Sequence, residues 1–338
     1  MLSTNLFNKL SYKKGINYLH LYYTSHVCFP SSILHVNVLK SSFMILGRTL
    51  TDMRFLTPLR YPGGKGKLAN YIKETYKANN IKKSHYIEPY TGGGAVALDM
   101  LFSGTTEHIH INDVDPAIYS FWFSVLNNTN DLIELIENTE ITIDEWFKQR
   151  EILKKNINDN NISTLELGFS AFFLNRTNRS GILKAGVIGG KSQSGKWKLD
   201  VRFNKQDLIN RIKRISLFSE QISLYNLDAV ALLKKLNNSV PIESLIYLDP
   251  PYYVKGQGLY RNFYTHDDHV LIKDALIESD FKNWLVSYDN APEIEDIYSD
   301  HPKMVYSLQY TAQKKSIGSE IMIYSKDIVI PETYLGKK

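Results

Sequence analysis

The sequence predicts an α/β protein with a doubly wound, mainly parallel sheet and a mostly helical insertion. Three observations lead to this prediction. After residue 53, short apolar strands alternate with helical patterns, as they do in a mainly parallel sheet. A glycine-rich turn follows the first predicted strand, at the place where such sheets bind ligands. A polar and basic stretch near residues 140–215 interrupts the alternation, which resumes after it.

The secondary-structure elements follow from the residue pattern in chain order. We predict helices at KLANYIKETY, at AVALDMLF, at PAIYSFWFSVL and over most of residues 131–174. Proline opens the third of these, where its missing N–H costs nothing. Residues 175–205 are rich in Gly, Asn, Ser and Lys and predict loops. We predict strands at HYIE, HIHIN, QISLY, SLIYL and WLVSYD, and a closing hairpin at MVYSLQY and EIMIYS.

The composition is that of an ordinary globular protein, with 43% hydrophobic and 22% charged residues among 338. Apolar runs stay below the roughly 20 residues that a membrane span requires. The single cysteine, Cys28, excludes a disulfide framework and a cysteine-based zinc site. These features predict a reducing, cytoplasmic setting.

The distribution of charge is more informative than its total. The whole chain carries +5, residues 1–52 carry +4 and residues 176–214 carry +9, so the remainder carries −8. A basic island in an otherwise acidic chain predicts a local surface that binds a polyanion. A solvated basic loop is the alternative.

The first fifty-two residues differ from the rest. Residues 1–51 contain no Asp or Glu, and their apolar residues follow no clear period. The segment faintly resembles a transit peptide, but Arg48 is its only arginine, and it has no secretory cleavage pattern. We predict that residues 1–52 are an extension outside the working fold, with a natural start at Met53.

A glycine turn between a strand and a helix is the first candidate site. Glu88 begins it and Gly92 and Gly94 lie within it, so backbone amides can approach a ligand closely. Asp113 follows the second strand about 20 residues later, where an acid commonly binds ribose hydroxyls. Tight packing of the glycines, and a structural or capping role for Asp113, remain alternatives.

The most specific signal is the motif Asp249-Pro250-Pro251-Tyr252, which ends a buried strand. Two prolines remove two backbone donors and stop ladder pairing. An ionised carboxylate and a proline carbonyl are both hydrogen-bond acceptors, which suits an amino group with two N–H bonds. The tyrosine offers a π-face to a flat heterocycle. A simple turn at a sheet edge would leave these neighbours as coincidence.

Together these stretches resemble the Dam-type (D12 class) S-adenosylmethionine-dependent DNA adenine-N6 methyltransferases, from about Leu59 to about Ser325. The resemblance rests on RYPGGKGKL, YIEPYTGGG, INDVD, FFLNRTNRSGI, DVRFNKQDLINRI and YLDPPY, in that order. It implies a Rossmann-like methyltransferase fold with an inserted DNA-recognition domain. The expected catalytic domain comprises residues 53–140 and 216–330, and the insertion comprises residues 141–215.

The resemblance also implies a cofactor, S-adenosylmethionine, and the residues that bind it. The third family motif is usually a Gly-Asp-Phe type element and here is Asn226-Leu227-Asp228, so Asp228 is its counterpart. The implied cofactor-binding set is Tyr61, Lys65, Glu88, Gly92, Gly94, Asp113, Asp228 and Asp249.

The implied mechanism removes the target adenine from the duplex, because N6 cannot be reached within the stack. Asp249 and the Pro250 carbonyl then hold the amino group while Tyr252 stacks on the base. Lys255–Tyr260 is expected to close over the adenine. No metal is expected: His266 and His269 are predicted to be solvated histidines beside a helix cap.

The basic island becomes the expected DNA-binding surface, in which phosphate contacts outnumber base contacts. Asn175 and Asn178 are candidates for contacts with bases. The full predicted set is Asn175, Arg176, Asn178, Arg179, Lys184, Lys191, Lys196, Lys198 and Arg202.

Other functions remain open at this stage. They are methylation of adenine in RNA, of a protein amide nitrogen or of cytosine N4, or a catalytically silent DNA-binding subunit. The expected partner is double-stranded DNA, methylated either within a restriction-modification system with a cognate restriction endonuclease or by an orphan or phage methylase. The expected oligomeric state is a monomer or weak dimer.

Overall fold

The computed structural model describes residues 55–61, 65–155, 162–254, 264–310, 316–333 and 335. The chain divides into two units, Met1–Arg54 and Phe55–Lys338. The extension expected at residues 1–52 and the loop expected at 255–260 lie outside the described residues. The fold below is that of the second unit.

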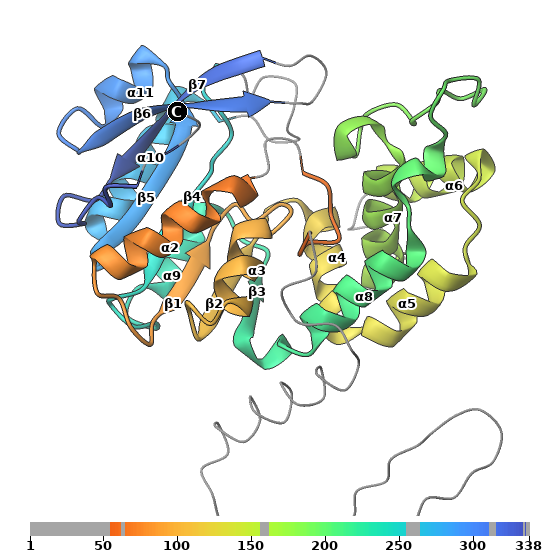
Figure 1. The fold of residues 1–338 in the computed structure, drawn as a ribbon, viewed down its shortest axis with the longest axis horizontal. Helices are drawn as coiled ribbons and strands as arrows, with labels where there is room; N and C mark the ends of the chain where they lie inside the picture. The colour runs from red at the N-terminus through yellow and green to blue at the C-terminus, as the bar shows by residue number, and fades with distance from the viewer. Residues whose placement is uncertain are drawn as a thin grey trace, which may run out of the picture. The chain divides into compact units, whose positions relative to one another are not determined.

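A seven-stranded sheet with the order β3-β2-β1-β4-β5-β7-β6 forms the centre of this unit (Figure 1). The first five strands are parallel, and β7 runs antiparallel between β5 and β6. This order confirms the doubly wound sheet and the closing hairpin. The strands are β1 (His85–Glu88), β2 (His108–Asn112), β3 (Ile222–Tyr225), β4 (Leu245–Leu248), β5 (Asn283–Asp289), β6 (Lys303–Tyr310) and β7 (Ser316–Tyr324).

Helices form at each stretch that is predicted to be helical, and α8 to α11 form in addition. Asp115 caps α4 by accepting the Ala117 N–H, and Pro116 occupies its first turn. Thr265 and Asp268 form a capping box at the start of α10. The α-helices are α2 (Ala69–Ala78), α3 (Ala95–Phe102), α4 (Pro116–Asn127), α5 (Thr129–Asn138), α6 (Ile143–Lys154), α7 (Thr164–Thr177), α8 (Lys205–Ser216), α9 (Ala229–Leu236), α10 (His266–Glu278) and α11 (Pro292–Ile297). Short 3₁₀ turns are η1 (Lys65–Leu68), η2 (Arg179–Gly181), η3 (Leu199–Arg202) and η4 (Ser219–Gln221).

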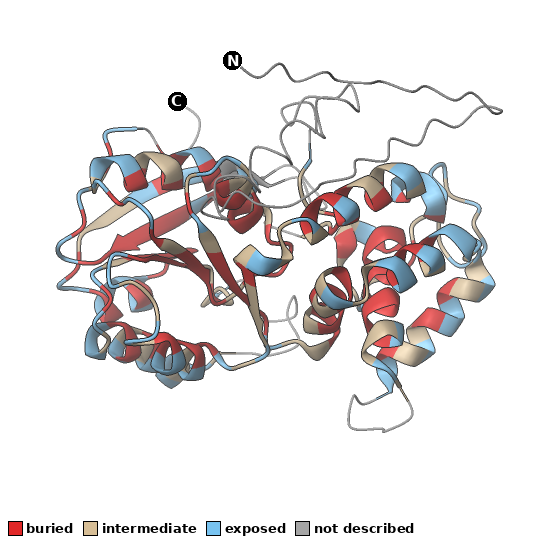
Figure 2. Ribbon diagram, turned by 90° about the horizontal axis from the view of Figure 1, so that it is seen from below, coloured by how far each residue is buried: buried red, intermediate tan, exposed pale blue. Residues whose placement is uncertain are grey.

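Two hydrophobic cores cover the two faces of the sheet. Successive strand residues point to opposite faces, so Tyr86 enters one core and Ile87 the other. Helices α2, α3 and α4 pack against the first face, and α9, α10 and α11 against the second. Figure 2 shows the strands as mostly buried between these layers. The carboxyl ends of the parallel strands therefore meet at one edge of a rigid, fully packed sheet.

Helices α5 to α8 form a group beside the sheet (Figure 1). The contact with the sheet domain runs through α4, which packs against α7. Gly168 on α7 allows this contact, because a Cβ there would lie 2.5 Å from the Ser120 carbonyl oxygen. The group begins with α5, ahead of the expected boundary at residue 141.

Within the described ranges, no helix combines the length and apolar character that a bilayer crossing requires.

Candidate active site

Acidic side chains gather at the carboxyl edge of the sheet. Glu88 ends β1, Asp113 follows β2, Asp249 follows β4 and Asp289 ends β5. Because β1 pairs with both β2 and β4, and β4 pairs with β5, these acids follow four adjacent strands. This is where open α/β sheets bind their ligands.

The turn after β4 is fixed by hydrogen bonds from β5. The Ser287 hydroxyl donates to Asp249 Oδ1 at 2.9 Å. Asp289 accepts the backbone N–H of Tyr253 at 2.9 Å and that of Val254 at 3.0 Å. These bonds satisfy the backbone amides of the two residues that follow the diproline and lie outside the strand ladder. Asp249 and the following residues are therefore held in one geometry.

Lys65 joins the first sequence motif to this turn. Its ammonium lies 3.4 Å from Asp249 Oδ1 and 2.5 Å from the Tyr252 hydroxyl oxygen. It also donates to both carboxylate oxygens of Glu320 on β7, each at 3.0 Å. Glu320 further accepts hydrogen bonds from Tyr252 and, at 2.6 Å, from Tyr306. We call Lys65, Asp249, Tyr252, Tyr306 and Glu320 the lysine cluster.

Neighbouring groups and burial shift the pKa of the Asp249 carboxyl. Burial raises the pKa of its carboxyl to about 6, while the ammonium of Lys65 opposes and the carboxylate of Glu320 reinforces that rise. The group is thus ionised at neutral pH and protonated below about pH 6. As a carboxylate it can accept hydrogen bonds from an amino group, so this function is lost as the pH falls through 6.

The glycine turn after β1 is packed between two aromatic rings. Gly92 has φ +47°, and a Cβ there would lie 2.6 Å from Tyr61 Cζ. The Trp122 indole N–H donates to the Gly92 carbonyl at 3.0 Å. Asp113 Oδ2 accepts the Gly92 N–H at 3.0 Å, which ties the acid after β2 to the glycine turn. Tyr61, Gly92 and Asp113 thus lie together.

A model of the D12 class N6 adenine-specific DNA methyltransferases matches residues 61–317. The chain belongs to this family. It is also similar to the type II methyltransferase M.MjaIII of Methanocaldococcus jannaschii, at 28% identity over 208 residues, which cover 57% of this chain and 68% of the relative. Among solved structures, the rRNA methyltransferase aviRa of Streptomyces viridochromogenes has a TM-score of 0.39 and 13% identity, covering 85% of this chain and 96% of that one. Because that TM-score is below 0.5, the fold assignment rests on the strand order.

The methyltransferase uses S-adenosylmethionine, whose amino and sulfonium groups are cationic. The acids at the carboxyl edge fit such a ligand. Glu88 is buried, and its Oε2 has no hydrogen-bond partner among the described residues. Burial raises the pKa of Glu88 to about 8 and that of Asp113 to about 7. Buried acids of this kind are stabilised when a cation binds beside them.

Asp228, the expected counterpart of the third family motif, lies at the start of α9. Its exposed carboxylate caps this helix by accepting the Val230 N–H. The neighbouring Asn226 donates to the Asp113 carbonyl at 2.7 Å, so the segment lies beside the acid that follows β2. The structure therefore brings the third motif to the same edge as the others.

Three residues expected to contact DNA are buried instead. Asn178 is 0% exposed: its Oδ1 accepts the Trp146 indole N–H, and its amide donates to two loop carbonyls. Asn175 exchanges two hydrogen bonds with the backbone of Arg60, and the Arg176 guanidinium donates to the Arg202 carbonyl. Because these side chains are buried and bonded within the protein, Asn175, Arg176 and Asn178 are not available for contacts with DNA.

The remaining basic residues of the predicted set are exposed, and aromatic rings lie among them. Trp197 is 61% exposed, with the Lys196 ammonium 5.5 Å from its ring centroid. Phe147 on α6 is also exposed, with the Lys191 ammonium 5.9 Å from its ring. Neither ring was predicted, although Trp197 stands between two lysines in the sequence, which was an available signal. The exposed basic residues are Arg179, Lys184, Lys191, Lys196, Lys198 and Arg202.

The partners of the Asp249-Pro250-Pro251-Tyr252 motif were not predicted either. Ser287 and Asp289 lie on β5, Tyr306 on β6 and Glu320 on β7. The signal for Glu320 is an acid directly before the apolar run IMIY, because a buried acid requires a partner. The histidine prediction is corrected in one respect: His266 is exposed, but His269 is buried and contacts Tyr288. In the part of the chain described, no cluster of potential metal ligands occurs.

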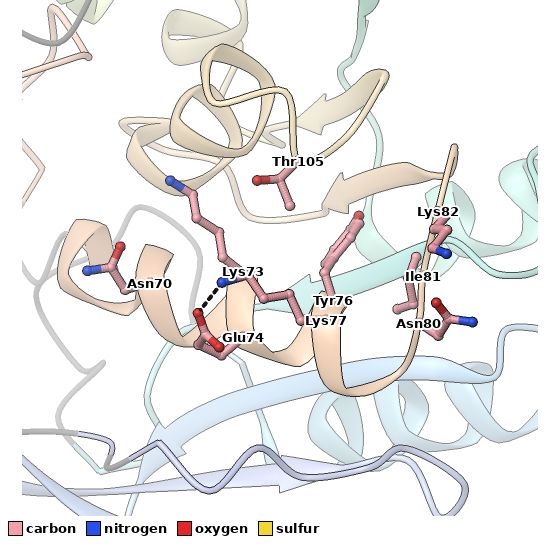
Figure 3. A pocket seen from close by; sticks show the side chains of 9 residues that line it. All are labelled: Asn70, Lys73, Glu74, Tyr76, Lys77, Asn80, Ile81, Lys82 and Thr105. Carbon is pink, nitrogen blue, oxygen red and sulfur yellow. Dashed lines mark hydrogen bonds and ion pairs between the residues drawn. The ribbon is translucent and has the colours of Figure 1, made fainter.

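A groove of about 580 Å³ lies at the opposite, amino-terminal edge of the sheet (Figure 3). It is lined by α2 and the segments that precede β1 and β2, including Lys73, Lys77 and Lys82. None of the predicted site residues lines this groove. The lysine cluster and the glycine turn, rather than this groove, mark the candidate active site.

Proposed function

We propose that this protein methylates N6 of an adenine that it has flipped out of duplex DNA, with Asp249 and Tyr252 as the residues that meet the base. The lysine cluster carries this proposal, because it places a tuned carboxylate and an aromatic ring together at the ligand-binding edge. Flipping is required because N6 cannot be approached in line within the stack.

S-adenosylmethionine supplies a methyl group made electrophilic by its sulfonium. On the protein side, one Asp249 oxygen and the Pro250 carbonyl accept the two N6–H bonds, which orients the nitrogen lone pair toward the methyl group. The carboxylate also stabilises the positive charge that develops on N6 during transfer. The ring of Tyr252 stacks on the adenine, while Pro251 keeps the turn rigid. Binding of the cofactor is assigned to Tyr61, Lys65, Glu88, Gly92, Gly94, Asp113, Asp228 and Asp249.

We assign target recognition to the inserted helical region, residues 141–215 together with α5. Its exposed lysines and arginines can neutralise phosphates, which supplies most of the non-specific affinity. Trp197 and Phe147 add flat apolar surfaces among these charges, and aromatic faces stack on unpaired bases. Buried amide side chains, such as that of Asn178, stabilise the loop that carries these residues through their hydrogen bonds.

The biological setting is a further part of the proposal. M.MjaIII is named a type II methyltransferase, which favours a role in a restriction-modification system and a cognate restriction endonuclease as partner. An orphan or phage methylase is the other possibility of this kind. We also propose a cytoplasmic location and a monomer or weak dimer.

The deciding experiment is methyl transfer from labelled S-adenosylmethionine to unmethylated duplex DNA, followed by sequencing that detects N6-methyladenine. We expect incorporation at adenines of one short sequence. Parallel reactions with RNA, and analysis for N4-methylcytosine, test the competing substrates. Incorporation into RNA alone, or into cytosine, would overturn the proposal, as would full activity of the Asp249→Ala variant.

A further inference from the structure

Glu320 is a buried carboxylate on β7, the strand next to the edge strand β6. It is 0% exposed and lies on β7, where it pairs with Asp289 of β5 on one side and Tyr306 of β6 on the other. A buried charge is costly unless it is paired and hydrogen-bonded. Glu320 meets this requirement through Lys65, Tyr252 and Tyr306, as described above.

The lysine cluster contains one cation and two carboxylates. The Lys65 ammonium is 3.0 Å from both oxygens of Glu320 and 3.4 Å from Asp249 Oδ1. The positive charge of Lys65 is therefore shared between the two carboxylates. When both acids are ionised, the net charge of the lysine cluster is negative. Without Glu320, the ammonium would act on Asp249 alone, and a carboxylate paired in this way is a weaker acceptor for a third group.

We propose that Glu320 is a positioning residue that offsets the charge of Lys65, so that Asp249 stays available to the adenine amino group, and that fixes Tyr252 through its hydroxyl. This inference rests on the proposed function and assigns a role to a residue outside the sequence motifs. Glu320 does not touch the reacting atoms; it acts through Lys65 and Tyr252.

The groups that face Asp249 support this charge balance. Burial raises its pKa, Lys65 lowers it and Glu320 raises it again. Ser287 lowers the pKa of Asp249 through its hydrogen bond. Neighbouring tyrosines carry no charge at neutral pH, because burial raises the pKa of each well above its ordinary value. Among the described residues, the groups that interact with Asp249 are Lys65 from η1, Glu88 from β1, Tyr247 from β4, Tyr252 from the turn, Ser287 from β5, Tyr306 from β6 and Glu320 from β7.

The test compares Glu320→Gln and Glu320→Asp with the wild-type protein. The measured quantity is kcat/KM for duplex DNA between pH 5 and pH 8. Gln keeps the shape of the side chain but removes its charge. We therefore expect the acidic limb of the pH profile of kcat/KM to move to lower pH by about one unit. At neutral pH, kcat/KM should be roughly tenfold to hundredfold lower than in the wild type. Asp keeps the charge, and its limb should remain close to that of the wild type.

Tyr306→Phe is the matched control, because it removes a hydrogen bond to Glu320 and leaves every charge of the cluster in place. Its acidic limb should not move. A role for Glu320 in packing alone would lower the rate of both Glu320 variants without shifting either limb. That outcome would overturn the proposal, and so would a Glu320→Gln rate within twofold of the wild type.

Lys65→Met carries the test if Glu320→Gln does not fold. Removal of the ammonium leaves two carboxylates facing each other, so the acidic limb must then move to higher pH; an unmoved limb would contradict the proposal.

Wild-type protein that transfers no methyl group to any DNA would refute the proposed function instead. An active wild type with unshifted variants refutes only the role of Glu320.

Discussion

At the carboxyl edge of the sheet, the motif residues Asp249 and Tyr252 are themselves the groups that we propose to contact the base. In the basic insertion, the motif residues Asn175 and Asn178 lie beneath the surface, and exposed residues such as Trp197 take the outer positions. A polar motif can thus encode either a reacting group or the scaffold under one. The hydrogen-bond partners distinguish the two, because scaffold amides are fully bonded to backbone and to neighbouring side chains.

The largest predicted effect is the loss of methyl transfer when Asp249 is replaced. Asp249→Ala removes the acceptor for N6 but leaves Lys65 paired with Glu320, so the protein should fold and still bind cofactor through the other residues of the assigned cofactor-binding set. We expect methyl transfer to fall by about 10² to 10⁴-fold. Labelled methyl incorporation measures the rate, and the thermal shift caused by S-adenosylmethionine measures cofactor binding. Asp327→Ala, at an exposed carboxylate, is the control and should retain the wild-type rate.

Asn178→Ala tests the scaffold side of the comparison. The change deletes three hydrogen bonds and leaves the Trp146 indole N–H without its acceptor, so the free energy of unfolding should drop by about 2 to 4 kcal/mol. Urea denaturation gives this value, with the exposed Asn70→Ala as control. Unchanged stability together with lost DNA affinity would instead make Asn178 a DNA ligand.

Trp197→Ala tests the exposed side. Because the ring is 61% exposed, the free energy of unfolding should change by less than about 0.5 kcal/mol. DNA binding should weaken by about 1 to 3 kcal/mol, or roughly fivefold to a hundredfold, if the ring stacks on a base. Fluorescence anisotropy with labelled duplex at fixed salt measures this. Leu271→Ala, at a similarly exposed residue of α10, should leave DNA affinity unchanged.

The smallest predicted effect is a proton released when cofactor binds. Glu88 has a pKa of about 8 and is mostly protonated at pH 7. A cation bound beside it favours the carboxylate, so up to about one proton should leave, and affinity should rise as the pH increases toward 8. Calorimetry in two buffers with different ionisation enthalpies counts the protons. Glu88→Gln should reduce the number, and an undiminished release from that variant would contradict this assignment.

Most of the fold follows from the sequence because its signals are local. The strand at residues 85–88, the glycine turn after it and Pro116 at the start of α4 each depend on neighbouring residues alone. The catalytic turn could likewise be placed from its own four residues, since a diproline must end a strand.

The rest of the site depends on contacts between distant parts of the chain. Lys65 and Glu320 are 255 residues apart, and no local pattern links them. Residue type also does not tell which way an amide points: Asn178 is polar, yet it binds Trp146 and loop carbonyls within the interior. Exposure separates the two kinds of residue in the insertion, and exposure is a property of the fold.

The position of β7 between β5 and β6 has a consequence for synthesis of the protein on the ribosome. Strand β6 leaves the ribosome before β7, yet its place in the sheet exists only after β7 has inserted beside β5. Glu320 arrives with that insertion, so Lys65 and Tyr252 lack this partner until β7 has been synthesised. Such long-range pairing is slow to form. A nascent chain therefore carries its glycine turn before the lysine cluster can form.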